Sequence, residues 1–284
     1  MTWREDVLNF DCEGTQLFGV LSLPNEAKRT GVVIVVGGSQ YRAGSHRQFV
    51  LLARCLAANG YPVLRFDYRG MGDSLGELGH FEHVEADLGA AVTALKHALP
   101  ILDRVVLWGL CDGASAALLY VQKTSDPHIA GLLLLNPWIR TAASHAKTQV
   151  RHYYLDRLKQ RAFWAKLFSG QVAGSALKGF VRSVRAAVQS APTPVAENVA
   201  YPTRMARGWQ HFKGQGLLLL SDQDYTAREF EAYIASYPDW TEALKERPLE
   251  RRALDQADHT CSQTAAELAM HRATIEFLDG LPLR

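Results

Sequence analysis

Apolar runs the length of a strand alternate along this chain with stretches whose apolar residues recur at helical spacing. The predicted strands are residues 15–24, 31–38, 61–70, 104–109, 129–137 and 216–224. The predicted helices are residues 46–59, 80–98, 112–122, 226–237 and 263–279. Strands that alternate with helices indicate an α/β fold, with a mostly parallel central sheet covered by helices on both faces.

This alternation is interrupted between residues 138 and 213, where no strong strand pattern occurs and helical spacing predominates, as in 151–168. We therefore expect residues 1–137 and 214–284 to form the two parts of one α/β core. Residues 138–213 are expected to form a helical insertion that serves as a cap or lid at one edge of the functional site.

Composition limits the class of protein. Of the 284 residues, 48% are hydrophobic and 21% are charged, which is enough apolar material for a full core. The formal net charge of +2 argues against a general nucleic-acid binder. The first ten residues lack the apolar region of a signal peptide, and no apolar run reaches about 18 residues. We expect a cytoplasmic protein without a transmembrane segment; a peripheral association with the inner membrane is the alternative.

Four cysteines are scattered along the chain, at positions 12, 55, 111 and 261. No pair has the spacing of a redox motif, and no His/Cys cluster has the spacing of a zinc site. This usage fits a reducing compartment better than a disulfide framework. We expect no metal and no cofactor.

One cysteine lies in a turn between a predicted strand and a helix, in the pattern Gly109-Leu110-Cys111-Asp112-Gly113. This is the pattern of a nucleophile elbow, with cysteine at the nucleophile position. A helix N-terminus and a neighbouring imidazolium favour the reactive thiolate form of cysteine. We predict that Cys111 is a nucleophile and that the backbone N–H of Asp112 binds an oxyanion. The alternative is a small buried cysteine with a packing role.

The elbow pattern predicts an acid and then a histidine later in the chain. Asp222 and Asp224 both follow the predicted strand at 216–224. We favour Asp224, because the loop needs a few residues to reach the histidine, and Asp222 remains the alternative. His259 lies between the last strand region and the last helix, where the pattern places the catalytic base.

The loop after the strand at 31–38 should supply the second oxyanion donor. Paired glycines at 37–38 allow a close backbone approach, and the donor is predicted to be the amide of Ser39 or Gln40. The residues expected to contact substrate are Gly38, Tyr41, Trp138 and Arg151.

Together these motifs resemble the α/β-hydrolase superfamily. They lie at residues 37–49, 66–74, 108–116, 217–224 and 257–260. The cysteine elbow and the loop GSQYRAGSHRQF resemble, more narrowly, the exosortase A system-associated hydrolase 1 group. That resemblance implies an α/β-hydrolase fold, a triad of Cys111, Asp224 and His259, and a setting in exopolysaccharide production and exosortase-dependent protein sorting. It implies no particular substrate.

Charge is unevenly distributed along the chain. Residues 140–213 contain 13 Lys and Arg but only two acidic residues, whereas the remainder has 18 basic and 27 acidic residues. One interpretation is a solvated cationic face. The other is recruitment of an anionic partner, such as an acyl carrier protein, a coenzyme A ester, an acidic polysaccharide or an anionic membrane.

Three functions compete at this point. The favoured one is an acyl hydrolase or acyltransferase that forms an acyl-cysteine intermediate, preferentially from a thioester or an activated ester. The second is a binding or scaffold protein on a hydrolase fold. The third is a dienelactone-type hydrolase of a small cyclic ester, for which a large basic lid has no evident use.

Overall fold

The computed structural model of the chain describes residues 2–38, 40–139 and 199–282. The first compact unit of the chain comprises Met1–Ile139 and Val199–Arg284. Arg140–Asn198 is assigned to a second unit, which lies outside the described residues.

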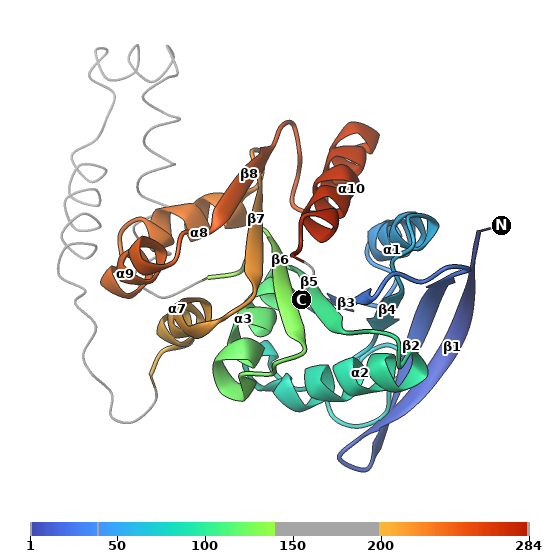
Figure 1. The fold of residues 1–284 in the computed structure, drawn as a ribbon. Coiled ribbons are helices and arrows are strands. Elements are labelled where there is room, and N and C mark those ends of the chain that lie inside the picture. The colour runs from blue at the N-terminus through green and yellow to red at the C-terminus, as the bar shows by residue number, and fades with distance from the viewer. Residues whose placement is uncertain (1, 39, 140–198, 283–284) are drawn as a thin grey trace, which may run out of the picture. The chain divides into compact units, whose positions relative to one another are not determined.

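Within the described residues, eight strands form one sheet in the order β1-β2-β4-β3-β5-β6-β7-β8 (Figure 1). The strands are β1 Trp3–Cys12, β2 Thr15–Pro24, β3 Thr30–Val35, β4 Val63–Phe66, β5 Arg104–Leu110, β6 Ile129–Leu135, β7 Gln215–Ser221 and β8 Glu250–Leu254. Strand β2 pairs antiparallel with β1 and β4, and every other neighbouring pair is parallel. The carboxyl ends of the parallel strands therefore meet at one edge of the sheet.

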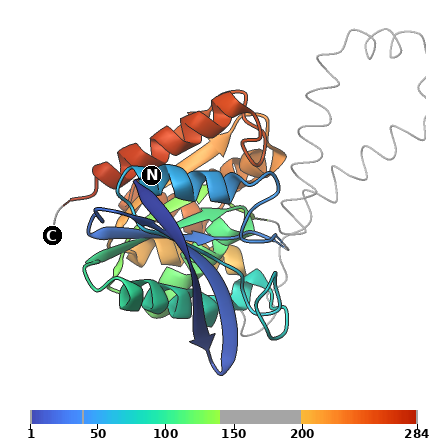
Figure 2. The ribbon, with the colours of Figure 1, turned by 90° about the vertical axis from the view of Figure 1, so that its right-hand side faces the viewer.

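Helices cover both faces of the sheet. They are α1 Gln48–Ala58, η1 Phe81–His83, α2 Glu85–Ala98, α3 Asp112–Thr124, α7 Tyr201–His211, α8 Tyr225–Ile234, α9 Pro238–Glu246 and α10 Thr264–Asp279. Figures 1 and 2 show α1 and α10 on one face and α2 and α3 on the other. None of the described helices is both long and apolar enough to cross a membrane.

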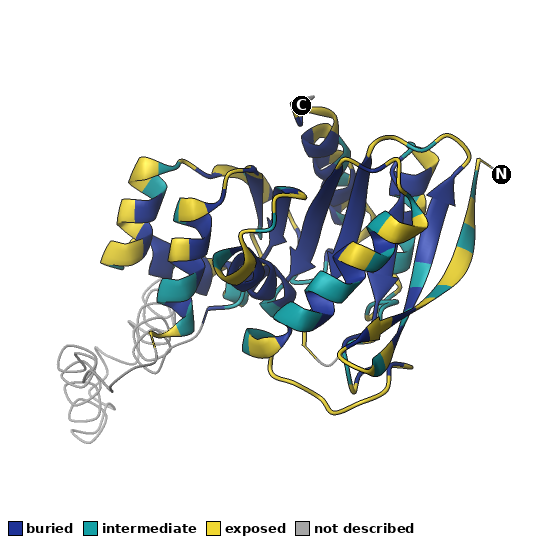
Figure 3. Cartoon of the chain, turned by 60° about the horizontal axis from the view of Figure 1, so that its bottom comes forward, coloured by how far each residue is buried: buried dark blue, intermediate teal, exposed yellow. Residues whose placement is uncertain are grey.

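Beyond their first residues, the central strands β3 and β5 are apolar because both of their faces are covered. All residues of β3 and β5 are buried, and Figure 3 shows this buried layer between helices with exposed outer faces. On one face, a Cβ at Gly31 would lie 2.8 Å from Leu102 Cδ1, so glycine permits close packing there. On the other face, the indole N–H of Trp108 donates to Thr274 Oγ1 of α10 at 3.2 Å.

The predicted α/β architecture is confirmed, and each of the six predicted strands has a counterpart. The pattern did not predict β1, β8 or α9. Both strands lie at the edges of the sheet and carry many charged, exposed residues, so they lack the apolar signal of the central strands. Strand β1 forms a hairpin with β2 through a two-residue turn, Glu13-Gly14, and both turn residues have positive φ.

The predicted insertion ran from 138 to 213, but helix α7 within that range belongs to the first unit. This helix packs against α3. A Cβ at Gly208 would lie 2.3 Å from the carbonyl oxygen of Leu118, so glycine allows the two helix backbones to approach closely. The rest of the predicted insertion lies outside the described residues, and its role as a lid stays a prediction.

Candidate active site

The turn between β5 and α3 holds Cys111 in a strained backbone conformation. Its φ of 58° and ψ of −126° lie in a region that residues with side chains rarely occupy. The Cys111 amide donates to the carbonyl of Leu135 at 2.9 Å, and its carbonyl accepts from the Trp138 amide at 3.1 Å. These two bonds to the end of β6 fix the turn, which leaves the thiol half-buried at the start of α3.

Both flanking glycines are required by close contacts across this turn. A Cβ at Gly109 would lie 2.6 Å from the Cα of Ala114. A Cβ at Gly113 would lie 2.3 Å from the carbonyl oxygen of Val35. Both obstacles are backbone atoms, which cannot move aside as a flexible side chain can. The G-x-C-x-G spacing is therefore a steric consequence of placing a helix directly above the end of a central strand.

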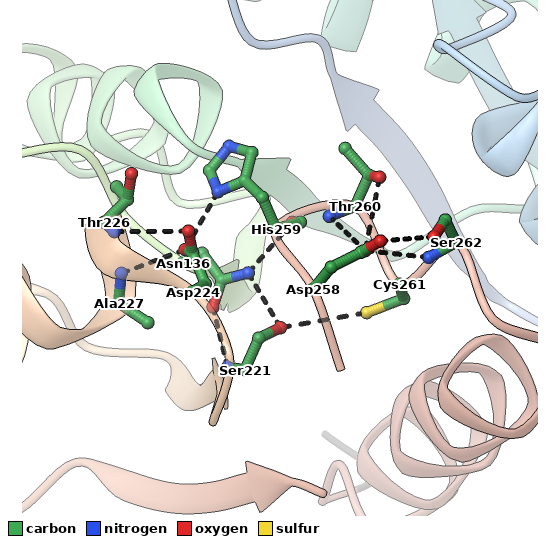
Figure 4. Close-up of polar contacts among 10 residues, drawn as sticks. All are labelled: Asn136, Ser221, Asp224, Thr226, Ala227, Asp258, His259, Thr260, Cys261 and Ser262. Atoms are coloured by element: carbon green, nitrogen blue, oxygen red, sulfur yellow. Dashed lines mark hydrogen bonds and ion pairs between the residues drawn. The ribbon is translucent and has the colours of Figure 1, made fainter. Parts of the chain in front are cut away.

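Asp224 and His259 come together at the ends of β7 and β8 (Figure 4). The imidazole Nδ1 lies 2.9 Å from Asp224 Oδ2. Asp224 also accepts the amides of Thr226 at 3.2 Å and Ala227 at 3.0 Å, so its carboxylate caps helix α8 as well. Three donors converge on one buried carboxylate and hold it in place.

Asp222, the alternative acid, is exposed and has a different partner. Its Oδ1 accepts the amide of Ala257 at 3.1 Å, which ties the loop after β7 to the loop that carries His259. The structure therefore brings Asp224, and not Asp222, against the histidine.

The pKa of His259 is raised by its neighbours Asp224 and Cys111. Burial acts to lower the pKa of the imidazole, but hydrogen bonds with Asp224 and Cys111, and the charges of both groups, raise it to about 10. Because Nδ1 faces Asp224, the Nε2 side of the ring is the one left for the Cys111 thiol. With a pKa of about 10, the ring is protonated at neutral pH.

The loops that carry the acid and the histidine are joined by Asn136, a buried residue just past β6 with a φ of 46°. Figure 4 shows its side chain between Ser221 and the His259 backbone. The Asn136 amide group donates to Ser221 Oγ at 2.9 Å and to the His259 carbonyl at 3.0 Å, and its oxygen accepts the Ser221 amide at 2.9 Å. One side chain thus links the segment after β6 to the end of β7 and to the loop that follows β8.

Two further side chains, Asp258 and His46, fix the histidine loop. Asp258 Oδ1 accepts the amides of Thr260 at 3.1 Å and Ser262 at 2.9 Å, which closes a tight turn directly after His259. The ring Nε2 of His46, which precedes α1, lies 3.1 Å from the Thr260 carbonyl oxygen. The histidine loop is therefore held by bonds within itself and by a contact from the loop after β3.

The loop after β3 is anchored by a buried ion pair. Asp67, at the end of β4, is fully buried and accepts the Arg42 amide at 2.7 Å as well as its guanidinium. Arg42 Nη2 also lies 2.7 Å from Asp73 Oδ2. The motif at 66–74 thus supports the loop after β3.

Comparison with known families gives the same fold and assigns the chain to a family. The model of the family described as serine aminopeptidase, S33 (Hydrolase_4) matches residues 27–193. The chain belongs to this family. Its elbow carries cysteine where the family name specifies serine. The comparison with curated proteins found no match.

Solved structures similar to this S33-family chain are α/β-hydrolases with low sequence identity. The Pyrococcus furiosus esterase Pf2001 superposes with a TM-score of 0.65 at 17% identity, covering 98% of this chain and 91% of that one. Est1E from Butyrivibrio proteoclasticus, solved with ferulic acid bound, gives 0.62 at 15% identity, covering 96% and 98%. GrgF from a Penicillium species gives 0.62 at 17% identity, covering 98% and 99%. At such identities the likeness shows the fold alone.

The predicted substrate contacts have different positions. Tyr41 is 44% exposed, and its hydroxyl donates to Asp73 at 2.5 Å. The Trp138 backbone lies against the nucleophile turn, and its carbonyl accepts from Ser115 Oγ at 2.6 Å. Gly38 faces the Asp112 carboxylate. Ser39 and Arg151 lie outside the described residues, and the donor role of Gln40 stays a prediction.

Sequence reasoning missed Asn136 and Ser221. The only local signal for Asn136 was an Asn-Pro dipeptide directly after a strand, which marks a turn. Nothing in the sequence pattern links it to Ser221, 85 residues later.

Proposed function

We propose that this protein is an acyl hydrolase or acyltransferase that forms an acyl-cysteine intermediate at Cys111. The single observation that carries the proposal is the contact of His259 with both Asp224 and the Cys111 thiol at a strained elbow. A cysteine that only packs in the core does not require a histidine beside it. Still less does it require a buried carboxylate that accepts three hydrogen bonds and orients that histidine.

The reaction follows from these positions. The Cys111 thiolate attacks the acyl carbonyl carbon, and the backbone amide of Asp112 at the start of α3 stabilises the oxyanion that forms. As the tetrahedral intermediate collapses, the bond to the leaving group breaks, and the imidazolium of His259 gives that group its proton. The neutral imidazole then removes a proton from water or another acceptor, which attacks the acyl-cysteine and releases the thiol.

We infer a preference for thioesters or activated esters. A thiolate nucleophile and a thiolate leaving group are similar in energy, so the intermediate collapses readily in either direction. An ordinary oxyester has a poorer leaving group, and its intermediate tends to expel the cysteine instead.

Intact-protein mass spectrometry tests the proposal. The wild-type protein and Cys111→Ala are each mixed with short and long acyl thioesters and activated esters and then quenched in acid. We expect an acyl adduct on wild type and none on Cys111→Ala. Cys55→Ala is the matched control, since Cys55 is a half-buried free thiol on α1, and it should form the adduct normally. An adduct of equal yield on Cys111→Ala would refute the role of Cys111.

A further inference from the structure

The side chain of Asp112 lies against the start of the loop after β3, which is predicted to supply an oxyanion donor. Asp112 directly follows Cys111, and its Oδ1 accepts the backbone N–H of Gly38, 74 residues earlier in the chain. A Cβ at Gly37 would lie 2.6 Å from the same oxygen. The carboxylate therefore packs against the glycine pair that forms the start of this loop.

The carboxylate interacts with backbone amides of the two segments that are predicted to supply oxyanion donors. Burial raises the pKa of Asp112, while bonds from the amides of Gly38, Asp112 itself and Gly113 act in the opposite direction. These amides belong to the loop after β3 and to the first residues of α3. In this fold, the amide after the nucleophile and one from the loop after β3 form the oxyanion site. The Asp112 carboxylate therefore occupies a backbone amide of the loop after β3 next to the predicted nucleophile.

A second partner for the carboxylate lies nearby. Tyr68 is 6% exposed, and its hydroxyl has no hydrogen-bond partner among the described residues. Burial and then the charge of Asp112 raise the pKa of this hydroxyl, so the two groups are within electrostatic reach. An unpaired buried hydroxyl is a donor that could receive the carboxylate when it leaves the amides.

We propose that the Asp112 carboxylate is an internal occupant of the oxyanion site, and that the acyl carbonyl oxygen must displace it before Cys111 attacks. This inference rests on the proposed function. It makes Asp112 a specificity-determining residue, because other contacts of the substrate must supply the free energy of displacement. Small acyl donors that lack such contacts should acylate the wild-type enzyme slowly.

Kinetics of Asp112→Asn test the competition. Asparagine keeps the shape but removes the charge, so its hold on the amides is weaker. We expect the second-order rate constant for acylation by a small thioester to rise about fivefold, the order of one lost hydrogen bond. Alkylation of Cys111 by iodoacetamide is the matched readout, since it needs no oxyanion site and reports only the effect of the charge on the thiolate.

The ratio of acylation to alkylation decides between occupation and simple anchoring. If the Asp112 carboxylate occupies the oxyanion site, this ratio should rise in Asp112→Asn. If Asp112 only anchors the loop, acylation slows while alkylation is unchanged or faster, and that result overturns the inference.

A spectroscopic measurement separates this inference from the proposed function. The Gly38 amide proton in ¹H–¹⁵N correlation spectra should move upfield in Asp112→Asn, because a charged acceptor is replaced by a neutral one. A Gly38 signal that does not move shows that the carboxylate is not there. If the wild type forms no acyl adduct, the proposed function fails, whereas the Gly38 signal still decides the position of the carboxylate.

Discussion

At Cys111, backbone strain and side-chain electrostatics act on the same residue. A left-handed φ at a residue with a side chain costs about 1–3 kcal/mol, and the fold maintains it through hydrogen bonds to the Leu135 carbonyl and from the Trp138 amide. The proposed function accounts for this free-energy cost, because the turn places the thiol next to His259 and the Asp112 amide next to the thiol. The backbone strain, the contact with His259 and the two flanking glycines are all consistent with a nucleophilic role for Cys111.

The protonation of His259 leads to a prediction about pH. Its pKa is raised to about 10 from an ordinary value of 6.5, so the protonated ring contributes folding stability that is fully present below about pH 6.5. This contribution is lost as the pH rises through about 10. The same proton serves the leaving group, so acylation should fall over the same alkaline range.

Asp224→Asn should lower the pKa of His259 and move the alkaline limb of the acylation profile toward lower pH. The rate at the optimum should fall by at least about 100-fold, because the imidazole also loses its fixed orientation. Stopped-flow acylation across pH measures both effects. Asp222→Asn is the control, since it removes an equal charge from the same loop without touching His259. An unchanged alkaline limb in Asp224→Asn would show that Asp224 does not set the histidine pKa.

At the scale of elements, the site depends on loops that follow β3, β5, β6, β7 and β8. Their strands are fixed in register by the parallel sheet. The loops are then tied to one another by a few buried polar side chains, chiefly Asn136 and the Asp67–Arg42 pair. Buried polar groups of this kind hold a unique geometry only when all of their bonds are made.

Asn136→Ala tests the joint between the acid and histidine loops. Removal of the side chain leaves the buried Ser221 amide unpaired, which should lower the free energy of unfolding by about 1–3 kcal/mol. It also frees the His259 carbonyl, so turnover should fall more than substrate binding. Urea unfolding and steady-state kinetics measure the two effects. The control is Asn59→Ala, at an exposed asparagine after α1, which should leave turnover unchanged. Full activity in Asn136→Ala would rule out a positioning role for Asn136.

At the scale of the whole molecule, the charged residues are distributed unevenly along the chain. Most of the 13 basic residues between 140 and 213 lie outside the described residues. Among those described, Arg204 pairs with Glu82 at 2.5 Å. We propose that this excess of positive charge attracts an anionic carrier.

Salt dependence tests this recruitment. The KM for an acyl group carried by an acidic carrier protein should rise steeply from low to molar salt, because screening weakens attraction between exposed charges. The KM for an uncharged thioester with the same acyl group is the control and should change little. Equal salt dependence for the two substrates would indicate that the basic segment plays no part in binding.

Much of this protein follows from local sequence. The buried strands are continuous β-branched or leucine runs, because a parallel sheet covered on both faces excludes polar side chains. The elbow follows from two glycines four residues apart, each required by a backbone atom less than 3 Å away. The order of nucleophile, acid and histidine likewise follows from the order of the strands.

What only the tertiary structure decided are the contacts between side chains far apart in the chain. It places Asp224 rather than Asp222 against His259, Asn136 between two distant loops, and the Asp112 carboxylate on the Gly38 amide. The edge strands β1 and β8 also depend on pairing with a neighbour. Periodicity records which face of an element is buried, but the partner of a polar side chain depends on the packing of the whole sheet.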